Sequence, residues 1–553
     1  MIQATTVLLN MMLALGQPEK PSAAKAEPER VPTSEIRIDS GVVRGLVVGD
    51  KKAVHAFKGI PYAAPPVGEG RWKPPQPVSP WQGVRDCFEF GAACPQKMPT
   101  LFATIPEMAI RVPESEDCLF LNIWTPAERT SAKLPVLYWI HGGGYVMGAA
   151  SQPLYDGQEL ARLGCVVVSI NYRLGLFGFL AHPALSKEST DKVSGNYGLL
   201  DQIDGLRWVK RNIAAFGGDP NHVTIFGESA GGMSVLCLLA APEAKGLFHG
   251  AISQSPAWMN MAQLRETFPG EETAEQTGQR LLAGSGVPAS ADARQMRQLD
   301  VKALVQAAPA EPGPGAPLRL KPLTLWIGPI VDGHVLTDNP NTLFAAGRQH
   351  AVPVIIGNTR EEMSLLALGT KFPADEAAYL KQLKDDFGNL AGPVAKMYPA
   401  PDGKELKPAI IQLASDLSFV SETRHIARAH AAAGQKTFRY QFSRGSKRGF
   451  LQSLGAHHGC ELAFLFQRPA ARDDDGEMGI SRTIGRYWIN VAAAGDPNGQ
   501  GLPAWPAYRL DSEEMVDFAA DASILKRHRN DQLDVIERVL RGGAQAGSKK
   551  SEK

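Results

Sequence analysis

The stretch "TIFGESAGGMSV" at residues 224–235 places a serine between glycines at the point where an apolar run ends. Ser229 stands in a G-x-S-x-G pattern, which in many hydrolases holds a nucleophilic serine on a sharp turn between a strand and a helix. Glycine and serine are also ordinary turn residues, so the five-residue pattern alone is weak support for a nucleophile. The groups that a reactive serine requires elsewhere in the chain must decide between the two interpretations.

A serine hydroxyl needs a neighbouring base, and that base is oriented by a third group. In one known arrangement these groups follow in the chain order serine, acid, histidine. Of the 12 histidines, His457 and His458 lie in a late glycine-bounded loop, "GAHHGCELAFLF", and are the base candidates. Glu361 and Glu362 in "VIIGNTREEMSLL" are the acid candidates, although acidic residues also favour ordinary helix N-termini. The pattern leaves both pairs open, and two adjacent histidines lack the spacing of zinc ligands, so we expect no metal.

A second glycine-rich turn, "WIHGGGYVMG" at residues 139–148, also ends an apolar run. Backbone N–H groups fixed in such a turn can stabilise the negative charge that develops on an attacked carbonyl. Three consecutive glycines let the backbone approach a substrate, because no Cβ intervenes. The residue after the serine, Ala230, supplies a further N–H in sites of this type. The turn and the serine together predict acyl-transfer chemistry.

Short apolar runs alternate with helix-compatible segments along most of the chain. This alternation predicts a mostly parallel sheet that is covered by helices on both faces. Ser229 follows one of these runs and precedes a segment that suits a helix, which favours the nucleophile turn over an ordinary turn. We expect strands at residues 134–140, 165–172, 222–227, 250–255, 352–358 and 436–443, a helix at 198–216, a hairpin at 36–48, and loops at 57–77 and 308–322.

The overall composition is typical of a soluble globular protein with ample length for a large core. The 553 residues are 44% hydrophobic and 21% charged, and 58 basic residues nearly balance 57 acidic ones, for a net charge of +1. A net charge near zero provides no overall attraction to nucleic acid or anionic lipid. No apolar run reaches the length that a membrane span requires. We therefore expect neither a nucleic-acid partner nor a membrane span.

The two ends of the chain differ from the rest. Residues 1–34 contain an apolar segment and an A-x-A cleavage pattern at 24–26, as in a signal peptide with a disordered lead-in. No Lys or Arg precedes the apolar segment and Asn10 interrupts it, which counts against export. We expect a secreted or periplasmic protein, with a cytoplasmic one as the alternative. One catalytic domain is expected at residues 35–540, and a disordered polar tail at 541–553.

Longer motifs resemble those of the type-B carboxylesterases, a family that includes cholinesterases and the non-catalytic neuroligins. "FGGDPNHVTIFGESAGG" at 216–232 is similar to the family's serine signature, and "EDCLFLNIWTP" at 116–126 is similar to its second signature. Blocks at 171–180, 195–202 and 495–498 follow in the family's order, so the resemblance covers residues 36 to 540 approximately. It implies an α/β-hydrolase fold, with a mostly parallel central β-sheet, helices on both faces and large loop insertions.

The resemblance also separates the residues that the pattern left open. In the family's histidine block the catalytic histidine directly precedes the second glycine, which selects His458. In its acid block the acid directly precedes the last glycine, which selects Glu362, although Met363 stands here in place of that glycine. The implied catalytic residues are Ser229, Glu362 and His458, and the implied oxyanion-hole donors are the N–H groups of Gly143, Gly144 and Ala230.

Further residues are expected to support this set. Ser255 matches a serine that contacts the catalytic acid in the family. The next residue is Pro256, where the family usually has a glycine. Glu228, directly before the serine, is the second expected supporting residue. The family's first disulfide matches Cys94 with Cys118, which implies a bridge between them.

Three alternative functions were weighed against ester hydrolysis. Neuroligin-like binding modules lose the serine or another member of the triad, whereas all three residues are present here. Choline selectivity depends on a tryptophan shortly before the "EDCL" block, and residues 95–117 contain no Trp or Tyr, with Phe102 the only aromatic residue. An amide, carbamate or lipid ester as main substrate remains an alternative, because the same triad can cleave it.

The expected acyl pocket lies just before "GPIVDG" at residues 328–333. By the resemblance, Leu323 and Leu325 match positions that cholinesterases fill with aromatic rings, although this match crosses a variable proline-rich loop. Leucine is smaller than phenylalanine, so we expect an apolar pocket that is roomier than one built for acetyl. The sequence thus predicts a carboxylic ester hydrolase for neutral esters of small to medium size, acting through an acyl-enzyme without metal or cofactor.

Overall fold

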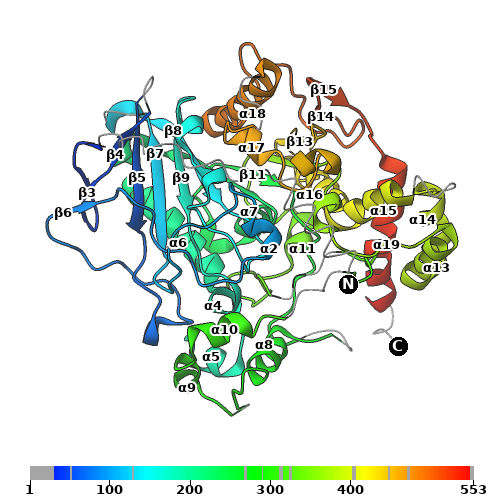
Figure 1. The fold of residues 1–553 in the computed structure, drawn as a ribbon, viewed down its shortest axis with the longest axis horizontal. Coiled ribbons are helices and arrows are strands. Elements are labelled where there is room, and N and C mark those ends of the chain that lie inside the picture. Colours follow the sequence, from blue (N-terminus) through cyan, green and yellow to red (C-terminus); the bar gives the residue numbers. More distant parts are fainter. Residues whose placement is uncertain are drawn as a thin grey trace.

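A twelve-stranded sheet runs through the middle of the molecule, and a three-stranded sheet lies beside its N-terminal edge (Figure 1). The large sheet has the order β1-β4-β5-β7-β9-β8-β10-β11-β12-β13-β14-β15, and the small sheet has the order β2-β3-β6. The strands are β1 Val31–Pro32, β2 Ile36–Ile38, β3 Gly41–Arg44, β4 Leu46–Val48, β5 Val54–Pro61, β6 Val84–Asp86, β7 Phe120–Thr125, β8 Leu134–Ile140, β9 Val166–Ile170, β10 Gly218–Glu228, β11 Gly250–Gln254, β12 Val354–Thr359, β13 Thr437–Phe442, β14 Met515–Phe518 and β15 Ala522–Leu525.

This computed structural model describes residues 30–49, 53–126, 130–266, 271–288, 290–309, 315–322, 325, 327–400, 406–445, 447, 449–469 and 474–548. The apolar segment of the expected signal peptide and Leu323 of the expected acyl pocket therefore lie outside the described residues.

The centre of the large sheet is parallel. Every neighbouring pair from β9 through β14 is parallel, whereas the pairs at both edges of the sheet are antiparallel. Strands β9, β11, β12 and β13 are buried along their whole length. Parallel strands of this kind need helices on both faces, so the expected α/β architecture is confirmed.

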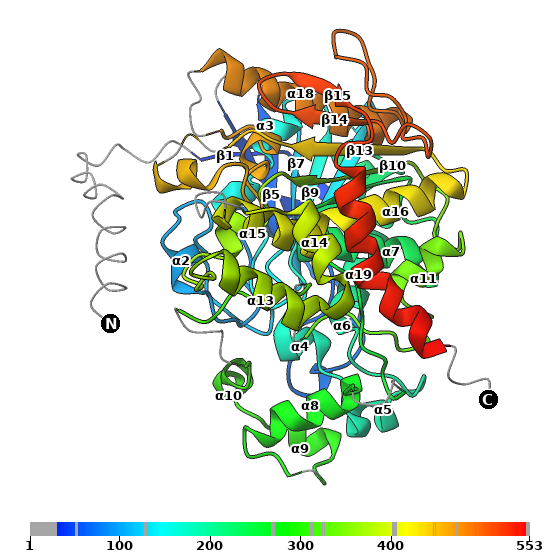
Figure 2. The same ribbon diagram turned by 90° about the vertical axis from the view of Figure 1, so that its right-hand side faces the viewer.

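Alternate residues of β8 enter different hydrophobic clusters, because successive side chains of a strand point to opposite faces. Tyr138 and Ile140 pack in a cluster with α6 and α7, and Leu137 and Trp139 pack in a second cluster with α18. Figure 2 shows α18 above the strands and α7 and α16 below them. None of the described helices is long and apolar enough to cross a membrane. The helices are α2 Thr100–Ala103, α3 Gln158–Ala161, α4 Gly175–Phe179, α5 Pro183–Glu188, α6 Tyr197–Asn212, α7 Ala230–Ala240, α8 Ala274–Ala283, α9 Ala293–Arg297, α10 Val301–Gln306, α11 Pro340–Ala345, α12 Met363–Leu366, α13 Glu376–Phe387, α14 Ala391–Met397, α15 Leu406–Ser415, α16 Ser421–Ala432, α17 Leu462–Leu465, α18 Asp475–Ala494 and α19 Asn530–Ser548.

A π-helical turn, Asp416–Val420, joins α15 to α16. All five of its residues are buried. Such turns are rare and occur mostly inside α-helices, frequently near functional sites. Here the ring of Phe419 lies 4.8 Å from the ring of His458, so the turn packs against a residue of the candidate site.

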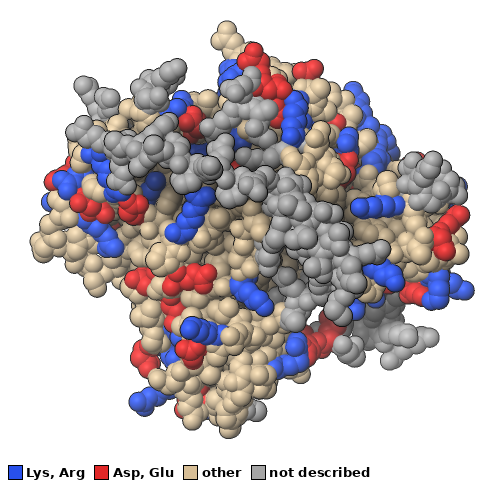
Figure 3. Space-filling model, in the orientation of Figure 1, with Lys and Arg blue, Asp and Glu red and all other residues tan. Residues whose placement is uncertain are grey.

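Charged side chains of both signs are interspersed on the face of the molecule shown in Figure 3. This distribution agrees with the net charge of +1. A face of this kind attracts neither polyanions nor polycations over long distances.

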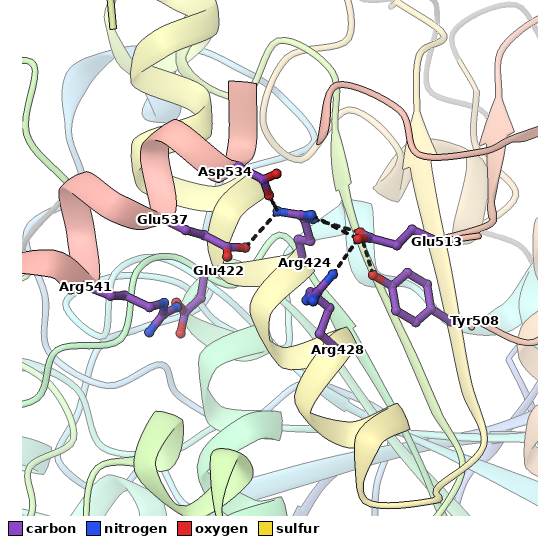
Figure 4. Close-up of polar contacts among 8 residues, drawn as sticks. All are labelled: Glu422, Arg424, Arg428, Tyr508, Glu513, Asp534, Glu537 and Arg541. Carbon is purple, nitrogen blue, oxygen red and sulfur yellow. Dashed lines mark hydrogen bonds and ion pairs between the residues drawn. The ribbon is translucent and has the colours of Figure 1, made fainter. Parts of the chain in front are cut away.

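Helix α19 is joined to α16 by a cluster of charged residues around the buried Arg424 (Figure 4). Arg424 of α16 donates to Glu513 at 2.7 and 2.9 Å, to Asp534 at 2.7 Å and to Glu537 at 3.1 Å. Burial alone would raise the pKa of Glu513, but hydrogen bonding to Arg424 lowers it to about 2. Helix α19 continues to Ser548, past the domain boundary that the sequence predicts at residue 540.

The disulfide that the resemblance implies between Cys94 and Cys118 is not present in the structure. All six cysteines lie within the described residues and are free thiols, so the implied disulfide is not formed in this structure. Cys94 and Cys118 are both buried and interact directly. A hydrogen bond with Cys94 and burial together raise the pKa of the Cys118 thiol well above its usual value.

Candidate active site

Ser229 lies on a strained turn between β10 and α7. Its backbone has φ 58° and ψ −122°, a combination that residues with a side chain rarely adopt. The Ser229 N–H donates to the Gln254 carbonyl at 2.9 Å, and its own carbonyl accepts from the Met233 N–H at 2.9 Å. These two hydrogen bonds hold the serine in a conformation that an isolated turn would not maintain.

The glycine two residues after the serine is required by close packing. A Cβ on Gly231 would lie 2.1 Å from the Ile140 carbonyl oxygen, which is impossible without movement of β8. Only glycine therefore lets the start of α7 approach the end of β8. The glycines of the motif thus serve the geometry of the turn, as the nucleophile interpretation requires.

Glu362 and His458 are joined directly. His458 Nδ1 lies 2.5 Å from Glu362 Oε2. The other oxygen, Oε1, accepts from Ser255 Oγ at 2.6 Å and from the Thr359 N–H at 2.7 Å. Glu362 is completely buried, so these contacts provide all the hydrogen bonding that its carboxylate has in place of water.

The two neighbouring candidates point elsewhere. Glu361 Oε2 accepts from the Ala456 N–H at 2.8 Å, and His457 Nδ1 lies 3.0 Å from the His458 carbonyl oxygen. Burial lowers the pKa of His457. The structure therefore brings Glu362 and His458 together and leaves Glu361 and His457 out of the pair.

The departures from the family pattern leave this pair intact. Met363 begins α12, and its N–H donates to Ser415 Oγ at 3.0 Å. Ser255, which precedes Pro256, has φ 46° and still donates to Glu362.

The far nitrogen of His458 faces a second carboxylate. His458 Nε2 lies 3.1 Å from Glu228 Oε1. Burial alone would lower the pKa of His458, but the charges of Glu228 and Glu362 raise it to about 9. Burial raises the pKa of Glu228 to about 7. Ser229 Oγ has no hydrogen bond to His458 among the contacts of the described residues, although both residues line one cavity.

Glu461 is a further buried carboxylate beside this group, and the sequence analysis missed it. Its Oε1 accepts from Gln254 Nε2 at 3.1 Å. Burial, followed by the charge of Glu228, raises the pKa of Glu461 to about 8. The signal was available, since Glu461 follows His458 by three positions in the same loop motif.

The glycine turn after β8 lies at the same cavity. Gly143 has φ 106°, and a Cβ there would lie 2.1 Å from the Met147 carbonyl oxygen. Gly143, Gly144 and Ala230 line the cavity together with Ser229 and His458. Ala230 is the first residue of α7, so its N–H has no acceptor within the helix and is free to bind an anion.

The cavity has a volume of about 310 Å³, within the range of about 300–1,000 Å³ that is typical of small-molecule sites. Its walls are mainly apolar and include Phe102, Met108 and Leu365. Leu325 of the expected acyl pocket also lines it. The described residues contain no cluster of His, Cys, Asp and Glu side chains that could hold a metal ion. The arrangement can therefore place a neutral organic group next to a serine, a histidine and several N–H donors.

Known proteins resemble this chain over nearly its whole length. The sequence profile of the Carboxylesterase family matches residues 32–536. The chain is 34% identical over 505 residues to a fumonisin B1 esterase of Sphingopyxis macrogoltabida, covering 89% of this chain and 88% of the relative. It is 35% identical over 502 residues to the para-nitrobenzyl esterase of Bacillus subtilis (strain 168), covering 88% and 94%. A solved structure of a PNB esterase superposes with a TM-score of 0.75 at 33% identity, covering 91% of this chain and 99% of that one. The chain therefore belongs to the carboxylesterase family and is a carboxylic ester hydrolase.

Proposed function

We propose that this esterase hydrolyses neutral esters of small to medium size through an acyl-enzyme on Ser229, with His458 as base and Glu362 as the acid that orients it. The observation that carries the proposal is the 2.5 Å contact between His458 Nδ1 and the buried Glu362, beside a strained serine in one apolar cavity. A non-catalytic binding module would have no need to maintain this strain.

The reaction proceeds in two halves. His458 Nε2 takes the Ser229 proton as the hydroxyl oxygen attacks the ester carbonyl, and the N–H groups of Gly143, Gly144 and Ala230 stabilise the resulting oxyanion. The proton then passes to the leaving alcohol as the acyl-enzyme forms. His458 next takes a proton from water as the water oxygen attacks the acyl carbon. It then returns this proton to Ser229 Oγ as the bond between Ser229 and the acyl group breaks, which releases the acid and restores the free serine.

Glu228 and Ser255 support this chemistry from either side of His458. Ser255 holds the Glu362 carboxylate in place through its 2.6 Å hydrogen bond. Glu228 faces Nε2, so a protonated His458 is stabilised when no substrate is bound. For catalysis, His458 must lose that proton and turn its lone pair to Ser229 Oγ.

Ser229→Ala should retain the fold and reduce the hydrolysis of p-nitrophenyl butyrate by roughly a thousandfold or more, because members of such triads act as a unit. His458→Ala and Glu362→Gln should also cause large losses. The neighbouring variants His457→Ala and Glu361→Gln are the matched controls, and they should keep most of the activity. Circular dichroism checks the fold of each variant, and a larger loss in a neighbour than in its partner would contradict the assignment.

The pH profile should depend on Glu228. Only neutral His458 can act as a base. The Glu228 charge raises the pKa of His458, so a higher pH is needed to produce the neutral, active form. Glu228→Gln should move the acid limb of kcat/KM to lower pH by about one unit, the effect of removing one close opposite charge. Glu361→Gln is the control that leaves the limb in place. A limb that stays fixed or moves upward in Glu228→Gln would exclude this role for Glu228.

The acyl side of the pocket should favour groups larger than acetyl. Each further methylene that fits can contribute up to about 0.8 kcal/mol of binding, so p-nitrophenyl butyrate should exceed the acetate in kcat/KM by a few-fold. The cavity lining offers Phe102 in the segment where choline-selective relatives carry a tryptophan. Butyrylcholine should therefore have no advantage over the neutral ester 3,3-dimethylbutyl butyrate. A strict acetyl preference, or a selective gain from the quaternary ammonium, would refute this assignment of the pocket.

We also propose that the protein is secreted or periplasmic, and that Cys94 and Cys118 form a disulfide there. Their direct contact supports this pairing. The bridge would lower the entropy of the unfolded chain and so raise the free energy of unfolding by roughly 3 kcal/mol. Peptide mapping without reductant of protein collected from the periplasm or medium should find the two cysteines linked. Two free thiols in such material would contradict the bridge.

A further inference from the structure

A second cavity of about 390 Å³ adjoins the catalytic one. Met233 and Leu325 line both cavities, so they form the partition between them. Met233 lies one turn after Ser229 on α7, and Leu325 Cδ2 lies 3.7 Å from the position of a Cβ on Gly144. The partition thus stands beside both the serine and the glycine turn. Methionine side chains adapt easily, so a flexible chain can pass such a wall.

The second cavity is lined by residues of two kinds. Met233 and Phe179 of α4 are buried and apolar, whereas Asn260 and Lys321 are exposed and polar. A lining that combines buried apolar and exposed polar residues suits a hydrocarbon chain that starts at the reacting carbonyl and extends toward solvent.

Trp258 forms part of the wall, and the C-terminal helix holds it. The guanidinium of Arg541 on α19 lies 4.7 Å from the centre of the Trp258 ring. Arg541 also donates to the fully buried Glu422 of α16 at 3.0 Å. The backbone N–H of Trp258 donates to the Ser418 carbonyl of the π-helical turn at 2.7 Å. The ring of Trp258 is therefore held by α19, and its backbone is held by the π-helical turn.

The position of Arg541 is itself fixed by the first half of α19. Asp534 and Glu537 of that helix pair with Arg424, so the helix is anchored to α16 one turn before Arg541. Figure 4 shows the Arg541–Glu422 pair beside the Arg424 cluster, with both contacts joining the same two helices. Arg541 is the residue of this group whose cation lies over the Trp258 ring among the described cation–π contacts.

We propose that the second cavity is a subsite for the distal part of medium-length acyl groups, and that Arg541 is a positioning residue that sets its width by holding Trp258. This inference rests on the proposed acyl-enzyme at Ser229, because the chain must start at that residue. An acyl group that passes Met233 and Leu325 places its terminal methylenes against the Trp258 ring. Without Arg541 the ring loses its cation–π contact, and the chain loses a defined wall.

The test measures kcat/KM for p-nitrophenyl octanoate relative to p-nitrophenyl acetate. Arg541→Met should lower this ratio by roughly two- to fivefold, the effect expected for the loss of one cation–π contact. The acetate rate should stay unchanged, because acetyl does not reach the partition. Arg541→Lys keeps the charge and should restore most of the ratio.

Asp534→Asn is the matched control. It removes one contact between α19 and Arg424 and keeps the Glu537–Arg424 pair one turn before Arg541, so it should leave the ratio unchanged. An equal fall in Asp534→Asn would show that general loosening of α19 is responsible and would overturn the role of Arg541. An unchanged ratio in Arg541→Met would do the same.

Two further measurements keep the test decisive. In a Trp258→Ala background, which should itself have a low ratio, Arg541→Met should have no additional effect, because its action runs through that ring. The kcat/KM for methyl octanoate should fall in the variants, and the kcat/KM for octyl acetate should not. The reverse result would place the alcohol group in the second cavity and overturn the proposal. Loss of acetate turnover in Ser229→Ala tests the acyl-enzyme separately, so the two hypotheses fail in distinguishable ways.

Discussion

The rest of the candidate site depends on the burial of one carboxylate. Glu362 has no exposed surface, and a buried carboxylate is costly unless its oxygens are hydrogen-bonded. Its partners are Ser255 after β11, Thr359 at the end of β12 and His458 in the loop after β13. These strands are neighbours in the parallel sheet, so their carboxyl ends meet at one edge. The sheet order is therefore what allows three distant segments to satisfy a single acid.

Much of the sheet could be predicted, because its central strands are short apolar runs bounded by turn residues. The run at residues 134–140 coincides with β8, whereas β10 starts at Gly218, before the run expected at 222–227. The residues between Gly218 and His222 are not apolar aliphatics and are partly or fully exposed, so no apolar pattern marks them. The antiparallel pairing at the N-terminal edge was not predicted, since β1 and β4 are very short and β5 runs to Pro61, into the segment expected to be a loop at 57–77.

The site could be predicted only in part from residue types. Neighbouring candidates such as Glu361 and Glu362 have the same chemistry, and only the path of the backbone decides which of them faces His458. The resemblance to a family decided between them, because residues of a shared motif have the same backbone geometry in related proteins. No motif marks the residues that line the second cavity. Its walls come from segments between residues 179 and 330 that meet only through tertiary packing.

The π-helical turn at Asp416–Val420 lies between the candidate catalytic histidine and a wall of the second cavity. Phe419 lies against His458, and the carbonyl of the preceding Ser418 holds the backbone of Trp258. Removing one residue from the turn would restore α-helical spacing and rotate one side of the helix against the other by about 100°. Phe419 and Ser418 could then no longer serve both neighbours. The length of this segment therefore couples the position of the base to the position of the pocket wall, whereas single side chains can be exchanged without shifting either.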